Sequence, residues 1–430
     1  MFLLVGCSIS FDRSRLNQDA GRADGGGDDG SGDDGGRDDG AVEGPCNEPV
    51  FGMDVLSEPP PGSLPPVGEP FADPSYRSCL QRVGDWEEET LRFSSPVSDR
   101  TGNWLLILRG VGNGLDWVAL DRSTGEVFPA VRLVDYAGFA GWDVSDDGTP
   151  RTLALVPADP ADPTSGPHFD RCIVGTSSCE TLPLRGTFSG ALSAVGASVD
   201  RQHWLLTEEH GGGDRIHLVE RSGASFELRS SLGSEVPASS QWTLSPAGRY
   251  LSQLDNEQLT IYDEFSPIRF ETSVDDVRFV TLSDGREAVV YRMDRSILFD
   301  SLTSPVTRRL QVPFGSDTTS LRVEMTTGPP GWLFVSFDRC RVEATMDCDA
   351  GAQWAQDKIV ALELEGDGRV VNLAWHRNRK RIHGTQSFSM ARGADGHGLF
   401  FVSDWQRTRE PTGGTRTSYP FELVLPNLLR

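Results

Sequence analysis

A short turn sequence recurs along this chain, and it constrains the fold more than any other feature. Seven short segments are rich in Ser, Asp, Pro and Gly, and the last residues of successive segments lie 37 to 65 positions apart. Six segments end in glycine and the third ends in Arg201. A repeat of this length indicates a fold built from copies of one small unit. The segments are Ser98–Gly102, Ser145–Gly148, Ser198–Arg201, Ser245–Gly248, Ser283–Gly285, Thr327–Gly331 and Gly393–Gly396.

Short runs in which apolar and polar residues alternate fill the spaces between these turns. Examples are 104–108, 216–219, 259–262 and 399–402. Alternation with a period of two predicts strands, and no segment beyond Trp86 has the pattern of an amphipathic helix. The repeat length matches a propeller blade of four strands. The residues six positions before each turn end suit a core position, except the first: Pro96, Trp142, Val195, Trp242, Phe279, Met325 and Met390.

The fourth repeat carries a family resemblance. Residues 242–251 read WTLSPAGRYL and are followed by LTIYD at 259–263. This pattern resembles the repeat of TolB-type β-propellers, which are related to WD-repeat proteins. Ala247 departs from the usual Asp of that turn, and Arg201 departs from the usual Gly. The resemblance implies an all-β fold, a β-propeller over residues 86–430. The seven turns favour seven four-stranded blades, with six or eight as the alternatives.

The final repeat is one strand short. It offers strands at 399–402 and 421–425 before the chain ends at Arg430. A closed propeller leaves few exposed strand edges, and an open edge promotes aggregation. We therefore expect a segment before Arg92 to supply the missing outer strand.

The amino terminus resembles a lipoprotein signal. Leu4-Val5-Gly6-Cys7 is similar to the lipobox of bacterial lipoproteins. That family implies cleavage before Cys7 and attachment of membrane lipid to its thiol, and Ser8 implies the outer membrane. A signal peptide has an apolar stretch of about 7 to 15 residues, so residues 1–7 are interpreted as a truncated signal with the true start codon upstream. The expected location is the bacterial cell envelope, anchored at the outer membrane on its periplasmic face or at the cell surface.

Two segments of unusual composition precede the repeats. Residues 8–44 include Asp19–Glu43, a stretch of nine Gly and nine acidic residues. Such a stretch cannot bury enough apolar surface to offset the entropy of ordering it, so we expect a disordered tether. Residues 45–85 are rich in Pro and form an expected extended lead-in, held by a disulfide.

The cysteines favour an oxidising compartment. Without Cys7, six of the seven remain, and an even number suits disulfide pairing. Six cysteines allow 15 pairings. Two pairs lie close together in sequence, and no C-x-x-C motif suggests a zinc site. The expected bridges are Cys172 with Cys179, Cys340 with Cys348, and Cys46 with Cys79.

The net charge and the absence of two common catalytic motifs argue against several classes of function. The net charge is −23, from 63 acidic and 40 basic residues, which argues against a nucleic-acid partner. No G-x-S-x-G or H-E-x-x-H motif occurs. His203, His210 and His217 are regularly spaced but span a triple-glycine turn, which disfavours a shared metal. Acidic pairs such as Asp275 and Asp276 are assigned to turn structure. We therefore predict no catalytic, metal-binding or cofactor-binding residues and no cofactor.

Candidate surface residues come from aromatic and basic groups. Tryptophans that directly follow repeat turns (Trp104, Trp204 and Trp332) are expected to pack in blade cores, whereas Trp117, Trp354, Trp375 and Trp405 fall outside that register. The one basic run, residues 376–383, could dock an anionic partner, although a solvated loop is the simpler interpretation. The possible partner surface comprises Trp405, Arg377, Arg379, Lys380 and Arg381.

These observations predict a membrane-anchored, extracytoplasmic lipoprotein. Its propeller is expected to bind a protein or an envelope polymer such as a polysaccharide, without catalysis. The alternative is a propeller hydrolase or lyase with its site at the mouth of the central channel. Fold alone does not decide between them, because propellers host both functions.

Overall fold

The computed structural model describes a large part of the chain, mainly the region of the repeats. The described residues are 8–9, 50–51, 63–73, 75–84, 91–111, 114–132, 138–143, 148–158, 166–232, 236–293, 296–302, 307–310, 323–337, 358–375, 390–394, 396–403 and 419–429. They form strands and one short 3-10 turn, Asn427–Leu429. No helix among them is long and apolar enough to cross a membrane.

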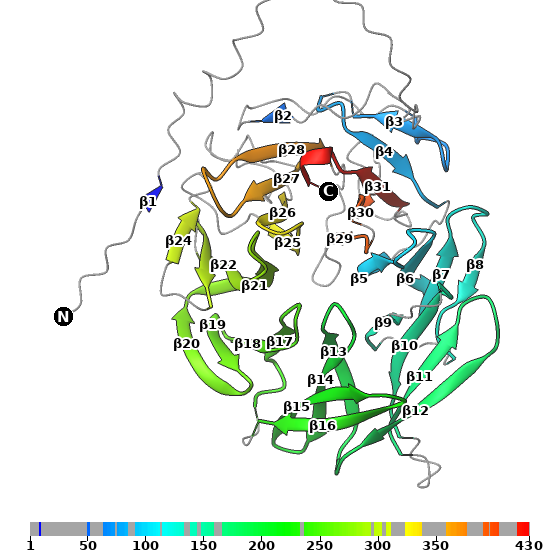
Figure 1. Ribbon diagram of the computed structural model, residues 1–430, viewed down its shortest axis with the longest axis vertical. Coiled ribbons are helices and arrows are strands. Elements are labelled where there is room, and N and C mark those ends of the chain that lie inside the picture. Colours follow the sequence, from blue (N-terminus) through cyan, green and yellow to red (C-terminus); the bar gives the residue numbers. More distant parts are fainter. Residues whose placement is uncertain are drawn as a thin grey trace, which may run out of the picture.

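The fold is all-β, and its antiparallel four-stranded units are arranged in a ring (Figure 1). The first unit contains β5 (Leu91–Ser98), β6 (Trp104–Val111), β7 (Gly114–Asp121) and β8 (Val127–Pro129). The next contains β9 (Ala140–Asp143), β10 (Arg151–Val156), β11 (His168–Ile173) and β12 (Cys179–Arg185). It is followed by β13 (Leu192–Ala197), β14 (His203–His210), β15 (Gly213–Ser222) and β16 (Ser225–Ser231). The outer strands β12 and β16 of these last two units pair in parallel, which joins them into one sheet.

The remaining units continue the ring in chain order. The fourth contains β17 (Gln241–Leu244), β18 (Tyr250–Asp255), β19 (Gln258–Asp263) and β20 (Ser266–Thr272). The fifth contains β21 (Val274–Thr281), β22 (Glu287–Met293), β23 (Ser296–Ser301) and β24 (Thr307–Leu310). Next come β25 (Val323–Thr327), β26 (Trp332–Phe337), β27 (Lys358–Glu363) and β28 (Val370–Trp375). The short strands β1 (Ser8–Ile9) and β2 (Val50–Phe51) pair with the outer strands β24 and β28.

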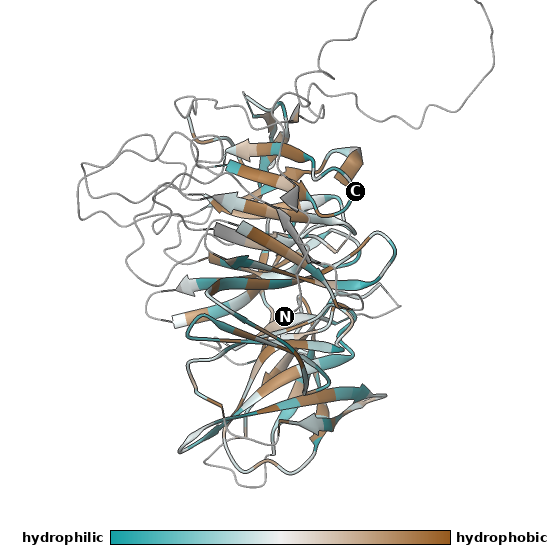
Figure 2. Cartoon of the chain, turned by 90° about the vertical axis from the view of Figure 1, so that its left-hand side faces the viewer, coloured by the Kyte–Doolittle hydropathy of each residue, from teal (hydrophilic) through white to brown (hydrophobic). Residues whose placement is uncertain are grey.

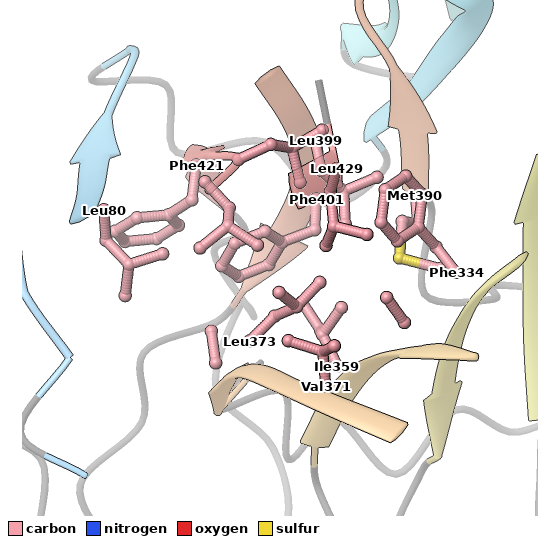
Figure 3. Packing of buried hydrophobic residues seen from close by; sticks show 14 of the residues in the cluster. Leu80, Phe334, Ile359, Val371, Leu373, Met390, Leu399, Phe401, Phe421 and Leu429 are labelled. Carbon is pink, nitrogen blue, oxygen red and sulfur yellow. The ribbon is translucent and has the colours of Figure 1, made fainter. Parts of the chain in front are cut away.

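The last unit confirms the expectation that an earlier segment supplies its outer strand. It contains β29 (Met390–Arg392), β30 (Gly398–Ser403) and β31 (Tyr419–Val424), extended by β4 (Cys79–Arg82) and β3 (Pro70–Ala72). Leu80 of β4 lies opposite Leu423 of β31. Figure 3 shows the apolar cluster that receives Leu80, together with Phe421, Phe401 and Leu373. Burial of these side chains stabilises the joined segments, because each fully buried one contributes about 1.5–3 kcal/mol.

The repeat turns lie where the sequence places them. Each of the seven connects the first strand of a unit to the second, and the last residue of each has a positive φ between 59° and 83°. Glycine adopts this left-handed conformation without strain. Arg201 adopts it with φ 59°.

Apolar residues gather between neighbouring units. In Figure 2, brown segments run along the strands, while many connecting turns are teal. Of the seven predicted core positions, Trp142, Trp242, Phe279, Met325 and Met390 are buried. Val195 contradicts the prediction with 37% exposure. It lies where β13 has a register irregularity between Ala194 and Gly196, which disturbs the alternation of faces.

The predicted bridge between Cys172 and Cys179 is confirmed. These residues face each other across β11 and β12, with 4.0 Å between their Cα atoms. Cys79 is also disulfide-bonded. Its expected partner Cys46 lies outside the described residues, as do Cys340 and Cys348.

Candidate functional site

Most of the predicted site residues lie outside the described part of the chain. These are the lipid-attachment residue Cys7 and the possible partner surface, Trp405, Arg377, Arg379, Lys380 and Arg381. Trp354 lies outside it as well.

Two predicted surface tryptophans are buried, so that prediction is wrong for them. Trp117 is 6% exposed, and its indole donates to the carbonyl of Gly138 at 2.7 Å. Trp375 is 2% exposed and donates to Ser75 Oγ at 3.0 Å. The Trp375 ring also packs on Tyr76, so the lead-in covers it. A register counted from the repeat turns could not show this, because the covering segment comes from elsewhere in the chain.

Arg201 connects three units of the ring. Its guanidinium donates to the carbonyl oxygens of Trp142 at 3.2 Å, Ser198 at 3.1 Å and Ser95 at 2.7 Å. The residue is fully buried. Burial lowers the pKa of Arg201 to about 10, an effect that Asp200 and Asp143 oppose. Arg201 therefore stays charged at neutral pH and stabilises the ring.

Acidic residues along the repeats have structural partners. The prediction that Asp275 and Asp276 lie at a turn is wrong, because both lie on β21. Asp284 pairs with Arg286 at 2.5 Å, and Asp276 pairs with Arg278 at 2.6 Å. Glu363 pairs with Arg369 at 2.8 Å. Among the described residues, no group of three or more His, Cys, Asp and Glu side chains could hold a metal ion.

The outer strand β20 exposes two large apolar side chains. Ile268 is 45% exposed and Phe270 is 68% exposed. They occupy alternate positions, so they lie on one face of the strand. The intervening Arg269 faces the opposite way and pairs with Asp300 of β23 at 2.8 Å. Within the described residues, β19 is the strand with which β20 pairs, so β20 lies at the edge of its sheet.

A polar cluster crosses strands β14, β15 and β16. Glu208 Oε2 lies 2.9 Å from His217 Nε2, and His217 Nδ1 lies 2.7 Å from Ser231 Oγ. Glu208 Oε1 accepts the backbone amides of Ser189 and Gly190. Each partner comes from a different segment, so no sequence motif reveals the cluster.

Electrostatics keeps the carboxylate of this cluster ionised. Burial would raise the pKa of Glu208, but the amides of Gly190 and Ser189, together with His217 and His210, lower it to about 2. His210 Nε2 lies 3.3 Å from Glu208 Oε2. Of the three histidines with regular spacing, His210 and His217 therefore meet at one carboxylate. His203 lies apart from them, with Nε2 3.1 Å from Arg229.

Comparison with known proteins shows the fold alone. No family and no curated protein matches this sequence. An oligogalacturonate lyase from Vibrio parahaemolyticus is similar in structure, with a TM-score of 0.51, 10% identity and coverage of 84% of this chain and 97% of that chain. An oligogalacturonate lyase in complex with manganese gives a TM-score of 0.53 and 11% identity, covering 89% of this chain and 99% of that chain. Both lyases are β-propeller proteins, and their low sequence identity supports the fold alone.

Proposed function

We propose that this chain is a membrane-anchored lipoprotein whose propeller binds an extended segment of a partner protein. In this proposal, lipid on Cys7 and the tether 8–44 hold a TolB-type propeller of seven four-stranded blades at the outer membrane of a bacterial envelope. The lipobox-like sequence before Cys7 supports the anchor, and the seven repeat turns support the blade number.

The binding role rests on β20, whose outer edge has no partner strand among the described residues. An open edge strand offers backbone donors and acceptors to an added strand, and exposed side chains at alternate positions select its sequence. This fold already adds strands elsewhere, since β24, β28 and β31 receive β1, β2 and β4. Ile268 and Phe270 would contact apolar side chains of the incoming segment.

The net negative charge of the chain favours a positively charged partner segment. With a net charge of −23, the chain attracts basic segments and repels acidic ones at moderate ionic strength. We therefore expect a partner strand with alternating apolar residues and flanking Lys or Arg.

Photo-crosslinking tests this proposal. A photoreactive amino acid replaces Phe270 in the full-length chain, in envelopes of the native host, and an equivalent chain carries it at Val199, which is 59% exposed on a turn. One protein crosslinked from position 270 and not from 199 would identify the partner. A synthetic peptide from its crosslinked region should then bind the wild type, and Phe270→Ser should weaken binding at least tenfold. Crosslinks to polysaccharide, or peptide binding unaffected by Phe270→Ser, would overturn the proposal.

The anchor has a separate test. Metabolic labelling with a radioactive fatty acid should label the wild type and not Cys7→Ser. An unlabelled wild type would remove the lipid anchor from the proposal and leave the binding edge untouched.

A hydrolase or lyase with a site at the channel mouth is the second candidate. Asp276 lies on β21, a first strand of its unit, and burial raises its pKa while Arg278 opposes the effect. Carboxyl groups with a raised pKa are common in catalytic sites. Turnover of oligogalacturonides by the wild type, lost in Asp276→Asn, would favour this candidate over binding at β20.

A further inference from the structure

We propose that Ser231, His217 and Glu208 form a hydrogen-bonded relay that makes Ser231 Oγ a nucleophile toward neutral carboxylic esters. This site lies on β14, β15 and β16, apart from the edge of β20, and so goes beyond the proposed binding function. The two hydrogen bonds of 2.9 Å and 2.7 Å give the order carboxylate, imidazole and hydroxyl. That order allows a serine to be activated by an adjacent base, which a third group orients.

The ionised carboxylate fixes the tautomer of His217. An ionised Glu208 only accepts hydrogen bonds, so His217 Nε2 must carry a proton. In the tautomer that carries its single proton on Nε2, Nδ1 is bare and accepts the hydroxyl proton of Ser231. The hydroxyl is thereby placed to lose its proton to the ring at 2.7 Å.

The base His217 is buried, whereas the nucleophile Ser231 is exposed. His217 is 4% exposed and Glu208 is 1% exposed. The Phe188 ring packs edge-on against the imidazole, with centroids 5.4 Å apart. Ser231 is exposed at the end of β16, so a reagent can reach Oγ from solvent.

Gly190 keeps Glu208 in place. Its amide donates to Glu208 Oε1 at 2.7 Å. A Cβ at position 190 would lie 2.1 Å from the carbonyl oxygen of Glu209, so only glycine permits this close approach. The segment before β13 therefore positions the acidic member of the relay.

The chemical step balances without an added cofactor. Ser231 Oγ attacks the ester carbonyl carbon, and its proton moves to His217 Nδ1. Collapse of the tetrahedral intermediate breaks the bond to the leaving alkoxide, which takes that proton from His217. Water then attacks the acyl-serine in the same way, releasing the acid and restoring the serine. An anionic ester is disfavoured because the chain carries a net charge of −23.

Covalent labelling tests the nucleophile. The full-length protein is treated with an alkyl fluorophosphonate, a neutral electrophile from which a serine displaces fluoride, and labelled peptides are identified by mass spectrometry. We expect a phosphonate on Ser231, and at least a hundredfold slower labelling in Ser231→Ala and in His217→Gln. Ser230→Ala is the matched control, since Ser230 neighbours Ser231 on β16 and should leave labelling unchanged.

A cysteine variant keeps the test decisive if His217→Gln fails to fold. Ser231→Cys changes one atom of an exposed side chain, and the adjacent imidazole should increase its thiolate fraction. Iodoacetamide should alkylate Ser231→Cys at least tenfold faster than Ser222→Cys, a cysteine at another exposed position, at neutral pH. Equal alkylation of the two cysteines, or a wild type without phosphonate on Ser231, would overturn the proposal.

Discussion

Two repeat turns with nearly the same backbone differ in how they attach to the rest of the ring. In both, the opening serine hydroxyl accepts a backbone amide five residues later, at 2.9 Å for Ser198 and 3.0 Å for Ser245. In both, the last amide bonds back to the carbonyl of that serine, at 3.0 Å from Arg201 and 2.9 Å from Gly248. The last residues share a left-handed φ of 59° and 78°.

The two turns are held from opposite directions. Arg201 sends its own side chain inward to carbonyl oxygens of two preceding units, at Ser95 and Trp142. Gly248 has no side chain, and its turn receives the carboxylate of Glu287 from the following unit, at 3.0 Å from Ser245 Oγ. In its side-chain contacts, one turn therefore supplies the connecting group itself and the other receives it from a neighbour. The two turns are also joined directly, since the Val199 amide donates to the carbonyl of Pro246 at 2.9 Å.

The comparison also shows that the glycine required for close packing lies at different places in the two cases. A Cβ at Gly141 would lie 2.8 Å from Arg201 Nε, so the arginine needs a glycine on β9. A Cβ at Gly248 would lie 2.5 Å from His203 Nδ1, so that turn needs its glycine in place. In both cases a glycine leaves room for a neighbouring side chain. For Arg201 this glycine is Gly141 on β9, and for His203 it is Gly248 in the turn itself.

Removing the Arg201 side chain should have the largest effect. Arg201→Gly suits the left-handed φ but removes three charged hydrogen bonds and leaves a cavity. Hydrogen bonds to charged groups contribute about 1.5–3 kcal/mol each and are not additive, so we expect unfolding free energy to fall by about 3–5 kcal/mol. Urea denaturation followed by tryptophan fluorescence measures this.

Arg201→Lys sharpens the same comparison. Lysine keeps the charge but lacks the planar fork of donors that reaches several carbonyls at once. We expect at least half of the loss caused by Arg201→Gly. A lysine variant as stable as the wild type would show that charge, and not the geometry of the guanidinium, holds the turn.

Gly141→Ala should show that Gly141 makes room for the Arg201 side chain. We expect a loss of about 1–3 kcal/mol in the wild type, because the new methyl group overlaps a fully buried guanidinium. In the Arg201→Gly background the same change should cost less than 1 kcal/mol, since the obstructing group is gone. Additive losses in the double-mutant cycle would contradict the coupling.

Gly248→Ala separates backbone strain from crowding. The variant suffers both the positive φ and the approach to His203, and we expect a loss of about 1–3 kcal/mol. Gly285→Ala is the matched control: φ is 83° there, but a Cβ meets nothing within 4 Å, so only the strain remains. Equal losses at the two glycines would mean that contact with His203 costs nothing.

Glu287 should give the smallest effect, visible as a pH dependence. Burial raises the pKa of Glu287, although the Ala247 amide and the Ser245 hydroxyl oppose this. Protons therefore bind more tightly in the folded state, and the stability contributed by Glu287 is lost as pH rises from the ordinary range of glutamic acid through its raised pKa. The stability difference between the wild type and Glu287→Gln should fall over that window. A difference that grows with pH would reverse the assigned direction.

The sequence predicted the architecture better than the site. Seven turns and alternating runs located the first and second strands, because each turn needs local residue types that are visible in one chain. The outer strand β4 followed from the missing strand of the last repeat. Val195 broke the prediction because a local irregularity shifts which face a residue occupies.

The polar clusters were missed for a different reason. Arg201 was noted only as a departure from glycine, although a charged residue at a left-handed position was the available signal. Ser231, His217 and Glu208 come from three strands, and their contact depends on register, which sequence spacing does not reveal. Trp117 and Trp375 were misplaced because their covering partners, Gly138 and the lead-in at Ser75 and Tyr76, are set by tertiary packing.

The position of β4 has a consequence for the order of assembly. Leu80 and Leu423 face each other across a gap of more than three hundred residues of chain. During synthesis, which begins at the amino terminus, β4 emerges long before its partner β31. The intermediate units can pair locally and quickly, whereas this final contact requires closure of nearly the whole chain and is slow. Until it forms, both edges stay open to chaperones, proteases and other copies of the chain.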